Sequence, residues 1–168
     1  MLKPDALPVE IERAAIRAAW RELAREDLLT FCQHVDRRYT PAPHLSLVAG
    51  ALERLESGAT RRLIISMPPQ HGKTQLASRY LLPWALGRAE ARGERAAYAV
   101  ASYGQRRAAD ITRGHRNLLQ SREYGELFPH VRLVDDKQAA DQWETRGGSS
   151  MLAAGVGGAL TGFPVSHI

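Results

Sequence analysis

Seven consecutive residues, Pro68-Pro69-Gln70-His71-Gly72-Lys73-Thr74, have the types and order of a loop that binds phosphate. In such a loop, backbone N–H groups and the start of a helix present partial positive charge to phosphate oxygens. We expect Lys73 to reach the β- and γ-phosphates of ATP and the Thr74 hydroxyl to ligate Mg²⁺. A side chain at Gly72 would obstruct the phosphate. The predicted nucleotide-binding residues are Pro69, Gln70, His71, Gly72, Lys73 and Thr74.

The residues around this loop strengthen the prediction. The apolar run before it predicts a buried strand over 61–66, and the residues from Lys73 onward can form a helix. The chain has only 3 lysines, so the Gly-Lys-Thr triplet does not follow from a lysine-rich composition. The usual motif has glycine where Met67 stands, and the alternative interpretation is an ordinary strand-to-helix turn with a surface lysine.

The composition is that of a soluble globular protein. The 168 residues, 44% of them hydrophobic, suffice for one domain with a core. No apolar run approaches the roughly 20 residues that cross a bilayer, and the first residues lack the features of a signal peptide. Cys32 is the only cysteine, which excludes an internal disulfide and fits a cytoplasmic setting.

The net charge of +5 favours a polyanionic partner such as nucleic acid. The 20 arginines are scattered along the chain, however, so a compositional bias toward arginine explains the charge equally well.

Alternating helices and strands after residue 60 predict an α/β fold with a mainly parallel sheet flanked by helices. Ligands of such sheets bind at the carboxyl ends of the strands, where the phosphate loop is expected. Pro83 should bend or end the helix that follows the loop near Leu82, and Gly147-Gly148 predicts a hairpin turn. The predicted helices are 9–29, one from Leu45 to Leu55, one from Lys73, 105–120 and 122–127; the predicted strands are 61–66, 96–101, 131–134, 142–145 and 149–154, and residues 87–93 are a predicted polar connection.

The order of these motifs resembles the ATPase domain of large terminase subunits, the DNA-packaging motors of tailed bacteriophages. The resemblance covers about residues 28–168, and in that family a Pro-Pro pair commonly replaces the first glycine of the loop, which explains Met67. The blocks that carry it are Thr40-Pro41-Ala42-Pro43-His44, the segment from Arg62 to Thr74, Pro83-Trp84-Ala85-Leu86-Gly87, Ala101-Ser102-Tyr103, Leu127-Phe128-Pro129 and the glycine-rich stretch from Gly155 to Gly162.

The resemblance implies a P-loop ATPase that couples ATP hydrolysis to translocation of double-stranded DNA into a procapsid. It implies a homo-oligomeric ring, a portal protein and a small terminase subunit as partners, and the cytoplasm of a bacterial host as location. Residues 1–39 would form an N-terminal helical segment and residues 40–168 a P-loop ATPase domain that is incomplete at the C-terminus. The strand with the acidic pair and the nuclease domain of that family are absent, so the water-activating carboxylate is unassigned and we expect the chain alone to turn over poorly.

Other residues have two interpretations each. The resemblance places His44 near the adenine, although a packing role at the start of a helix is an equal alternative. Ser102 and Tyr103 could couple nucleotide state to DNA, or Tyr103 could belong to the core. Gln70 stands where many members of the family have arginine. Arg113 and Arg146 are arginine-finger candidates, but surface salt bridges are their favoured role.

The tryptophans Trp20, Trp84 and Trp143 are expected in the core or in an interface. The cluster of Gln33, His34 and Asp36 is expected on the solvated surface rather than at a metal.

Two other functions remain open. One is a helicase-like DNA translocase unrelated to packaging. The other is a catalytically inactive truncated remnant or an interaction module, which would act through binding alone.

Overall fold

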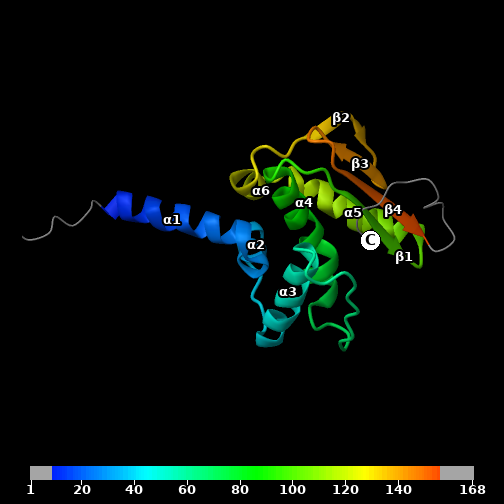
Figure 1. Cartoon of the computed structure of the whole chain (residues 1–168), viewed down its shortest axis with the longest axis horizontal. Helices are drawn as coiled ribbons and strands as arrows, with labels where there is room; N and C mark the ends of the chain where they lie inside the picture. The colour runs from blue at the N-terminus through cyan, green and yellow to red at the C-terminus, as the bar shows by residue number, and fades with distance from the viewer. Residues whose placement is uncertain (1–8, 156–168) are drawn as a thin grey trace, which may run out of the picture.

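The computed structural model describes residues 9–155, which form an α/β fold with a four-stranded sheet and a helical arm (Figure 1). The glycine-rich stretch beyond Gly155, on which part of the predicted resemblance rests, lies outside the described residues. The elements are α1 (Val9–Glu26), α2 (Leu28–Val35), α3 (Pro43–Glu56), the π-helix η1 (Gln75–Tyr80), α4 (Leu81–Ala91), β1 (Ala97–Ser102), α5 (Gln105–Leu119), α6 (Arg122–Leu127), β2 (Leu133–Gln138), β3 (Gln142–Thr145) and β4 (Ser150–Gly155).

The sheet is mixed, and the prediction of a mainly parallel sheet is wrong. Its strand order is β1-β4-β3-β2, in which only β1 and β4 run parallel. Strands β2, β3 and β4 follow one another through short connections, and short connections join antiparallel neighbours. The turn between β3 and β4 contains Gly148 with φ 88°, a left-handed conformation that glycine adopts readily, so the predicted hairpin is confirmed.

The predicted strand at 61–66 is absent from the sheet. Leu63, Ile65 and Met67 pack half-buried against the core, whereas the side chain of Ile64 is 95% exposed. The alternation of a strand is therefore present, but none of the four described strands pairs with this segment. The apolar run predicted a buried strand here, and that prediction is wrong, because the run alone does not tell whether a neighbouring strand completes the ladder.

Of the two alternatives predicted for Pro83, that it bends or ends the helix near Leu82, the second is wrong, because η1 continues directly into α4. Leu81 N–H donates to the Leu76 carbonyl, five residues back. In that register residue 83 would donate to the Ser78 carbonyl, but proline has no N–H. His115 of α5 hydrogen-bonds to this carbonyl. A side chain from another helix thus contacts the backbone just before Pro83.

Helix α4 also runs through most of the expected polar connection at 87–93. Gly87 lies buried inside the helix, and a Cβ built on it would be 2.5 Å from the ring of Phe128. Glycine at this position therefore permits close packing and does not mark a turn. This contact could not be predicted from the sequence, since its two residues lie far apart along the chain.

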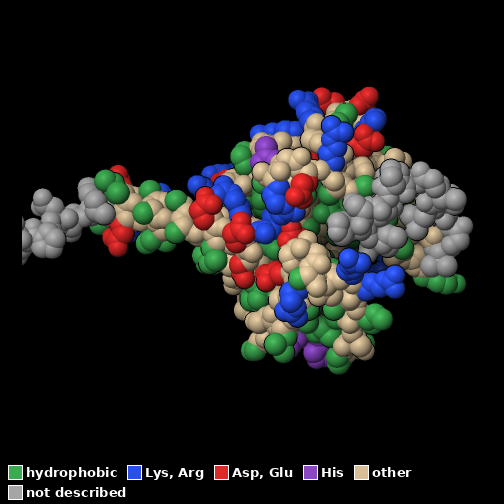
Figure 2. Space-filling view, in the orientation of Figure 1, with side chains coloured by type: hydrophobic (Ala, Val, Ile, Leu, Met, Phe, Trp, Pro, Cys, Tyr) green, Lys and Arg blue, Asp and Glu red, His purple; other side chains and the backbone are tan. Residues whose placement is uncertain are grey.

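The predicted helix 9–29 consists of two helices, because Asp27 caps the start of α2 by accepting a hydrogen bond from the Thr30 N–H at 2.7 Å. Helix α1 projects from the body, and hydrophobic side chains lie along it (Figures 1 and 2). Trp20 is 42% exposed on this arm, whereas Trp84 and Trp143 are buried in the body as predicted.

Candidate functional site

The predicted phosphate loop is an exposed turn with two residues in left-handed backbone conformations. Gln70 has φ 63° and Gly72 has φ 80°. A Cβ on Gly72 would also lie 3.0 Å from Cδ1 of Leu45 in α3. The structure therefore requires glycine at position 72 for backbone conformation and for contact with α3, in addition to the predicted clearance for phosphate.

Consecutive backbone amides of this turn have no acceptor. Within residues 9–155, the N–H groups from Gln70 to Thr74 donate to no backbone or side-chain oxygen, and the first loop-to-helix bond is that from Leu76 N–H to the Gly72 carbonyl at 3.0 Å. The first N–H groups of any helix lack intrahelical acceptors, and here the unpaired donors extend back into the loop. Such a run of amides attracts anions.

Two histidines hydrogen-bond to carbonyl oxygens of the loop. His71 Nδ1 lies 2.8 Å from the Pro69 carbonyl oxygen, and His44 Nε2 lies 3.2 Å from that of His71. A carbonyl only accepts, so both nitrogens carry the proton in these bonds. In a planar trans peptide the N–H points opposite to the C=O. The two histidines therefore orient the amides of Gln70 and Gly72 away from themselves. The sequence predicted His71 as a nucleotide-binding residue, and the structure shows in addition that its side chain hydrogen-bonds to the loop backbone.

Lys73 and Thr74 begin the helix that follows the loop. Lys73 is half-buried and forms no ion pair with any carboxylate of residues 9–155, so its charge is available to a ligand. Thr74 is exposed and borders a groove. The described residues contain no group of three or more side chains that could hold a metal ion. A magnesium ion at Thr74 would thus take one hydroxyl from this part of the chain and its other ligands from phosphate and water.

The other predicted residues lie apart from the loop. Tyr103 is 93% exposed directly after β1, so the alternative that placed it in the core is wrong. Ser102 ends β1 opposite Gly155 of β4. Gln105 ties this corner together, because its side-chain oxygen accepts from Gly155 N–H at 2.6 Å and its amide nitrogen donates to the Ala153 carbonyl at 3.2 Å. Within the described residues, neither Ser102 nor Tyr103 has a hydrogen bond to residues 68–74.

The remaining candidates have structural partners. Arg113 pairs with Asp110 and Arg146 with Asp135 on the surface, as the favoured alternative predicted.

The cluster around His34 is half-buried and is not simply solvated surface. His34 Nε2 lies 3.2 Å from the Glu123 carbonyl oxygen, and burial lowers its pKa. Asp36 accepts a hydrogen bond from the Tyr80 hydroxyl at 2.9 Å. These contacts account for two polar groups that the sequence alone left without a role.

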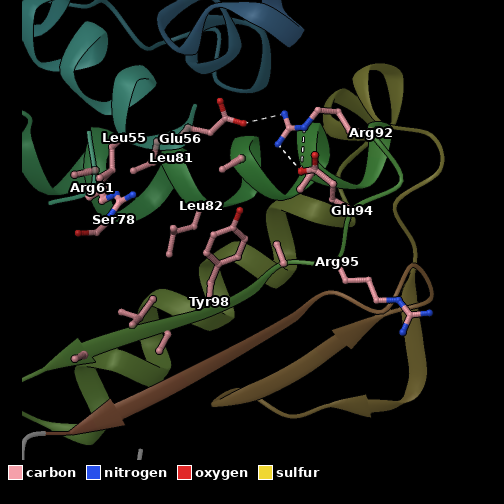
Figure 3. A pocket seen from close by; sticks show the side chains of 17 residues that line it. Leu55, Glu56, Arg61, Ser78, Leu81, Leu82, Arg92, Glu94, Arg95 and Tyr98 are labelled. Atoms are coloured by element: carbon pink, nitrogen blue, oxygen red, sulfur yellow. Dashed lines mark hydrogen bonds and ion pairs between the residues drawn. The ribbon is translucent and has the colours of Figure 1, made fainter. Parts of the chain in front are cut away.

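A hollow of about 630 Å³ between α4 and β1 was not predicted from the sequence (Figure 3). Tyr98 of β1 faces it, and burial raises the pKa of this phenol. Arg92 closes its rim through ion pairs of 3.1 Å to Glu56 and 2.9 Å to Glu94. Most of its lining is apolar and none of residues 68–74 belongs to it, so this hollow is separate from the predicted phosphate loop.

No helix in residues 9–155 combines the length and apolarity needed to cross a membrane.

Comparison of the chain with protein-family models, with curated proteins and with solved structures found no match.

Proposed function

We propose that this chain is the ATP-binding portion of a phage terminase large subunit, which couples ATP hydrolysis to the translocation of double-stranded DNA into a procapsid. The observation that carries the proposal is the exposed run of unpaired amides from Gln70 to Thr74, with an unpaired Lys73 at the start of the helix. This combination fits the triphosphate of ATP. The order of motifs around the loop supports the packaging role.

In this proposal the residues of the loop bind and orient the nucleotide. The amides hold the phosphate oxygens, Lys73 neutralises charge on the β- and γ-phosphates, and the Thr74 hydroxyl contributes one ligand to Mg²⁺. Bound Mg²⁺ would withdraw charge from the phosphate oxygens. His44 and His71 keep the loop peptides in the binding orientation through their hydrogen bonds to its carbonyls.

Nucleotide binding is tested by replacing Lys73 with alanine in the 168-residue chain. We expect Lys73→Ala to weaken binding of a fluorescent ATP analogue with Mg²⁺ by at least about tenfold, because a charge-assisted contact to phosphate is lost. The matched control is Lys137→Ala, which removes the same charge at an exposed pair with Glu144. Equal affinity for the Lys73 variant and the control would refute the assigned loop.

The packaging role has two rivals, a helicase-like DNA translocase and an inactive remnant or interaction module. Reading the gene beyond the codon of Ile168 distinguishes them. An apolar strand that ends in two acidic residues, followed by an acidic nuclease region, supports packaging. Helicase motifs there support the translocase, and an immediate stop codon supports the remnant.

A further inference from the structure

A second groove with phosphate-binding chemistry lies between η1 and α5. It has a volume of about 560 Å³, within the range of small-ligand sites. One wall carries Thr74, Ser78 and Arg79. The other wall is one face of α5, whose lining residues recur at helical spacing: Arg107, Asp110, Ile111, Gly114, Asn117 and Leu118, with Ser121 just beyond the helix end.

The positive charges of this groove are unpaired. Arg79 and Arg107 are exposed, and neither forms an ion pair with a carboxylate in the part of the chain that the structure describes. The guanidinium carbon of Arg79 lies 5.3 Å from the centroid of the Tyr80 ring. Asp110 is the one carboxylate among the lining residues, and Arg113, which is not part of the lining, pairs with it.

The floor of the groove is open at Gly114. A Cβ built on this glycine meets no atom of the described residues within 4 Å, so glycine leaves space there that no packing requires. Ile111 and Leu118 flank it as half-buried apolar residues. Hydroxyl and amide groups of Thr74, Ser78 and Asn117 surround this floor as neutral hydrogen-bonding partners.

We propose that the groove between η1 and α5 binds a phosphate group, held by Arg79 and Arg107, on a nucleic-acid backbone or a free nucleotide. Arginine forms paired hydrogen bonds to phosphate oxygens, and two unpaired guanidinium groups beside hydroxyl and amide donors provide that recognition. The groove adjoins the loop at Thr74, but its arginines lie outside the loop, so it is tested separately from nucleotide binding at Lys73.

The test measures binding of a labelled DNA duplex and of a fluorescent ATP analogue to the 168-residue chain. The double variant Arg79→Ala/Arg107→Ala is compared with Arg13→Ala/Arg146→Ala, which removes the same charge from α1 and the β3–β4 turn. If the ligand is a nucleic-acid backbone, the groove variant binds the duplex about tenfold more weakly than the control. Its log–log salt dependence then falls by about two counterions.

If the ligand is a free nucleotide, the groove variant instead loses affinity for the ATP analogue and retains the duplex affinity of the control. Gly114→Leu provides a second test, since its side chain enters the groove without meeting packed atoms and leucine favours the helix. It should reduce the same affinity that the double variant reduces, while Asp110→Asn should raise it. Equal binding of both ligands by the groove variants and the control variant overturns the proposal, whatever the result at Lys73.

Discussion

The contact between His115 and Ser78 predicts a specific dependence of stability on pH. Burial lowers the pKa of His115 to about 4 from its ordinary value of 6.5, despite its hydrogen bond to the Ser78 carbonyl. A side chain that is 0% exposed has no access to water to solvate its charged form. The unfolded chain therefore binds a proton at pH values where the folded chain does not.

The direction of the pH dependence follows from this difference in proton binding between the folded and unfolded chains. Between pH 6.5 and about 4 the unfolded state holds more protons on this residue, so the free energy of unfolding rises with pH in that window. The contribution of His115 is fully present above pH 6.5 and is lost as the pH falls toward the folded pKa. From the two pKa values, the loss between about pH 7.5 and about pH 4.5 amounts to about 2–3 kcal/mol.

The informative variant is His115→Gln. The glutamine amide nitrogen can still donate to the Ser78 carbonyl but does not titrate, so the variant should lack this part of the pH dependence. The assay is urea denaturation, followed by tryptophan fluorescence, at a series of pH values. The difference between wild type and variant isolates His115, because His34 and the carboxylates titrate in both proteins. Parallel stability curves for the two proteins would refute a buried, neutral His115.

Three further outcomes follow from single contacts. Gly87→Ala should lower the free energy of unfolding by about 1–3 kcal/mol, because the new Cβ would lie 2.5 Å from the Phe128 ring. The control in the same urea titration is Gly125→Ala in α6, whose new Cβ would meet no described atom within 4 Å. Trp143→Phe removes the indole N–H that donates to the buried Thr112 carbonyl at 3.0 Å, and should cost about 1–3 kcal/mol by thermal unfolding; no change would mean that the carbonyl finds another donor. Tyr103→Ser should leave stability within about 0.5 kcal/mol, because the ring is 93% exposed, and a larger loss would place that ring in a contact.

Local sequence signals predicted the elements that depend on nearby residues. The helix at Arg122–Leu127 and the strand at Gln142–Thr145 match the predicted ranges, and the Gly147-Gly148 turn lies where predicted. Each is determined by side-chain period, a capping residue or glycine conformation. Ser121, for example, caps α6 by accepting from the Tyr124 N–H at 3.2 Å.

The errors arose where distant residues decide the outcome. A proline inside a helix is disfavoured by local geometry, yet η1 and α4 continue through Pro83, and a histidine of another helix, His115, hydrogen-bonds to the Ser78 carbonyl before it. Similarly, Gly87 leaves room for the ring of Phe128, a residue far from it along the chain. The direction of the strands was mispredicted for the same reason, because it depends on which strands pair with one another and not on the residues of each strand alone.

The conformation of the candidate site depends both on residues within the turn and on a residue from a distant helix. Gly72, Lys73 and Thr74 were predicted from residue type and spacing, whereas the hydrogen bonds of His44 and His71 to the loop carbonyls were not. His44 comes from α3, and its bond to the His71 carbonyl exists only once that helix packs beside the loop. Because each held carbonyl turns the adjoining N–H outward, the anion-attracting surface is a product of the motif and of the helix packed against it. A phosphate loop read from sequence alone therefore identifies the donors but not what orients them.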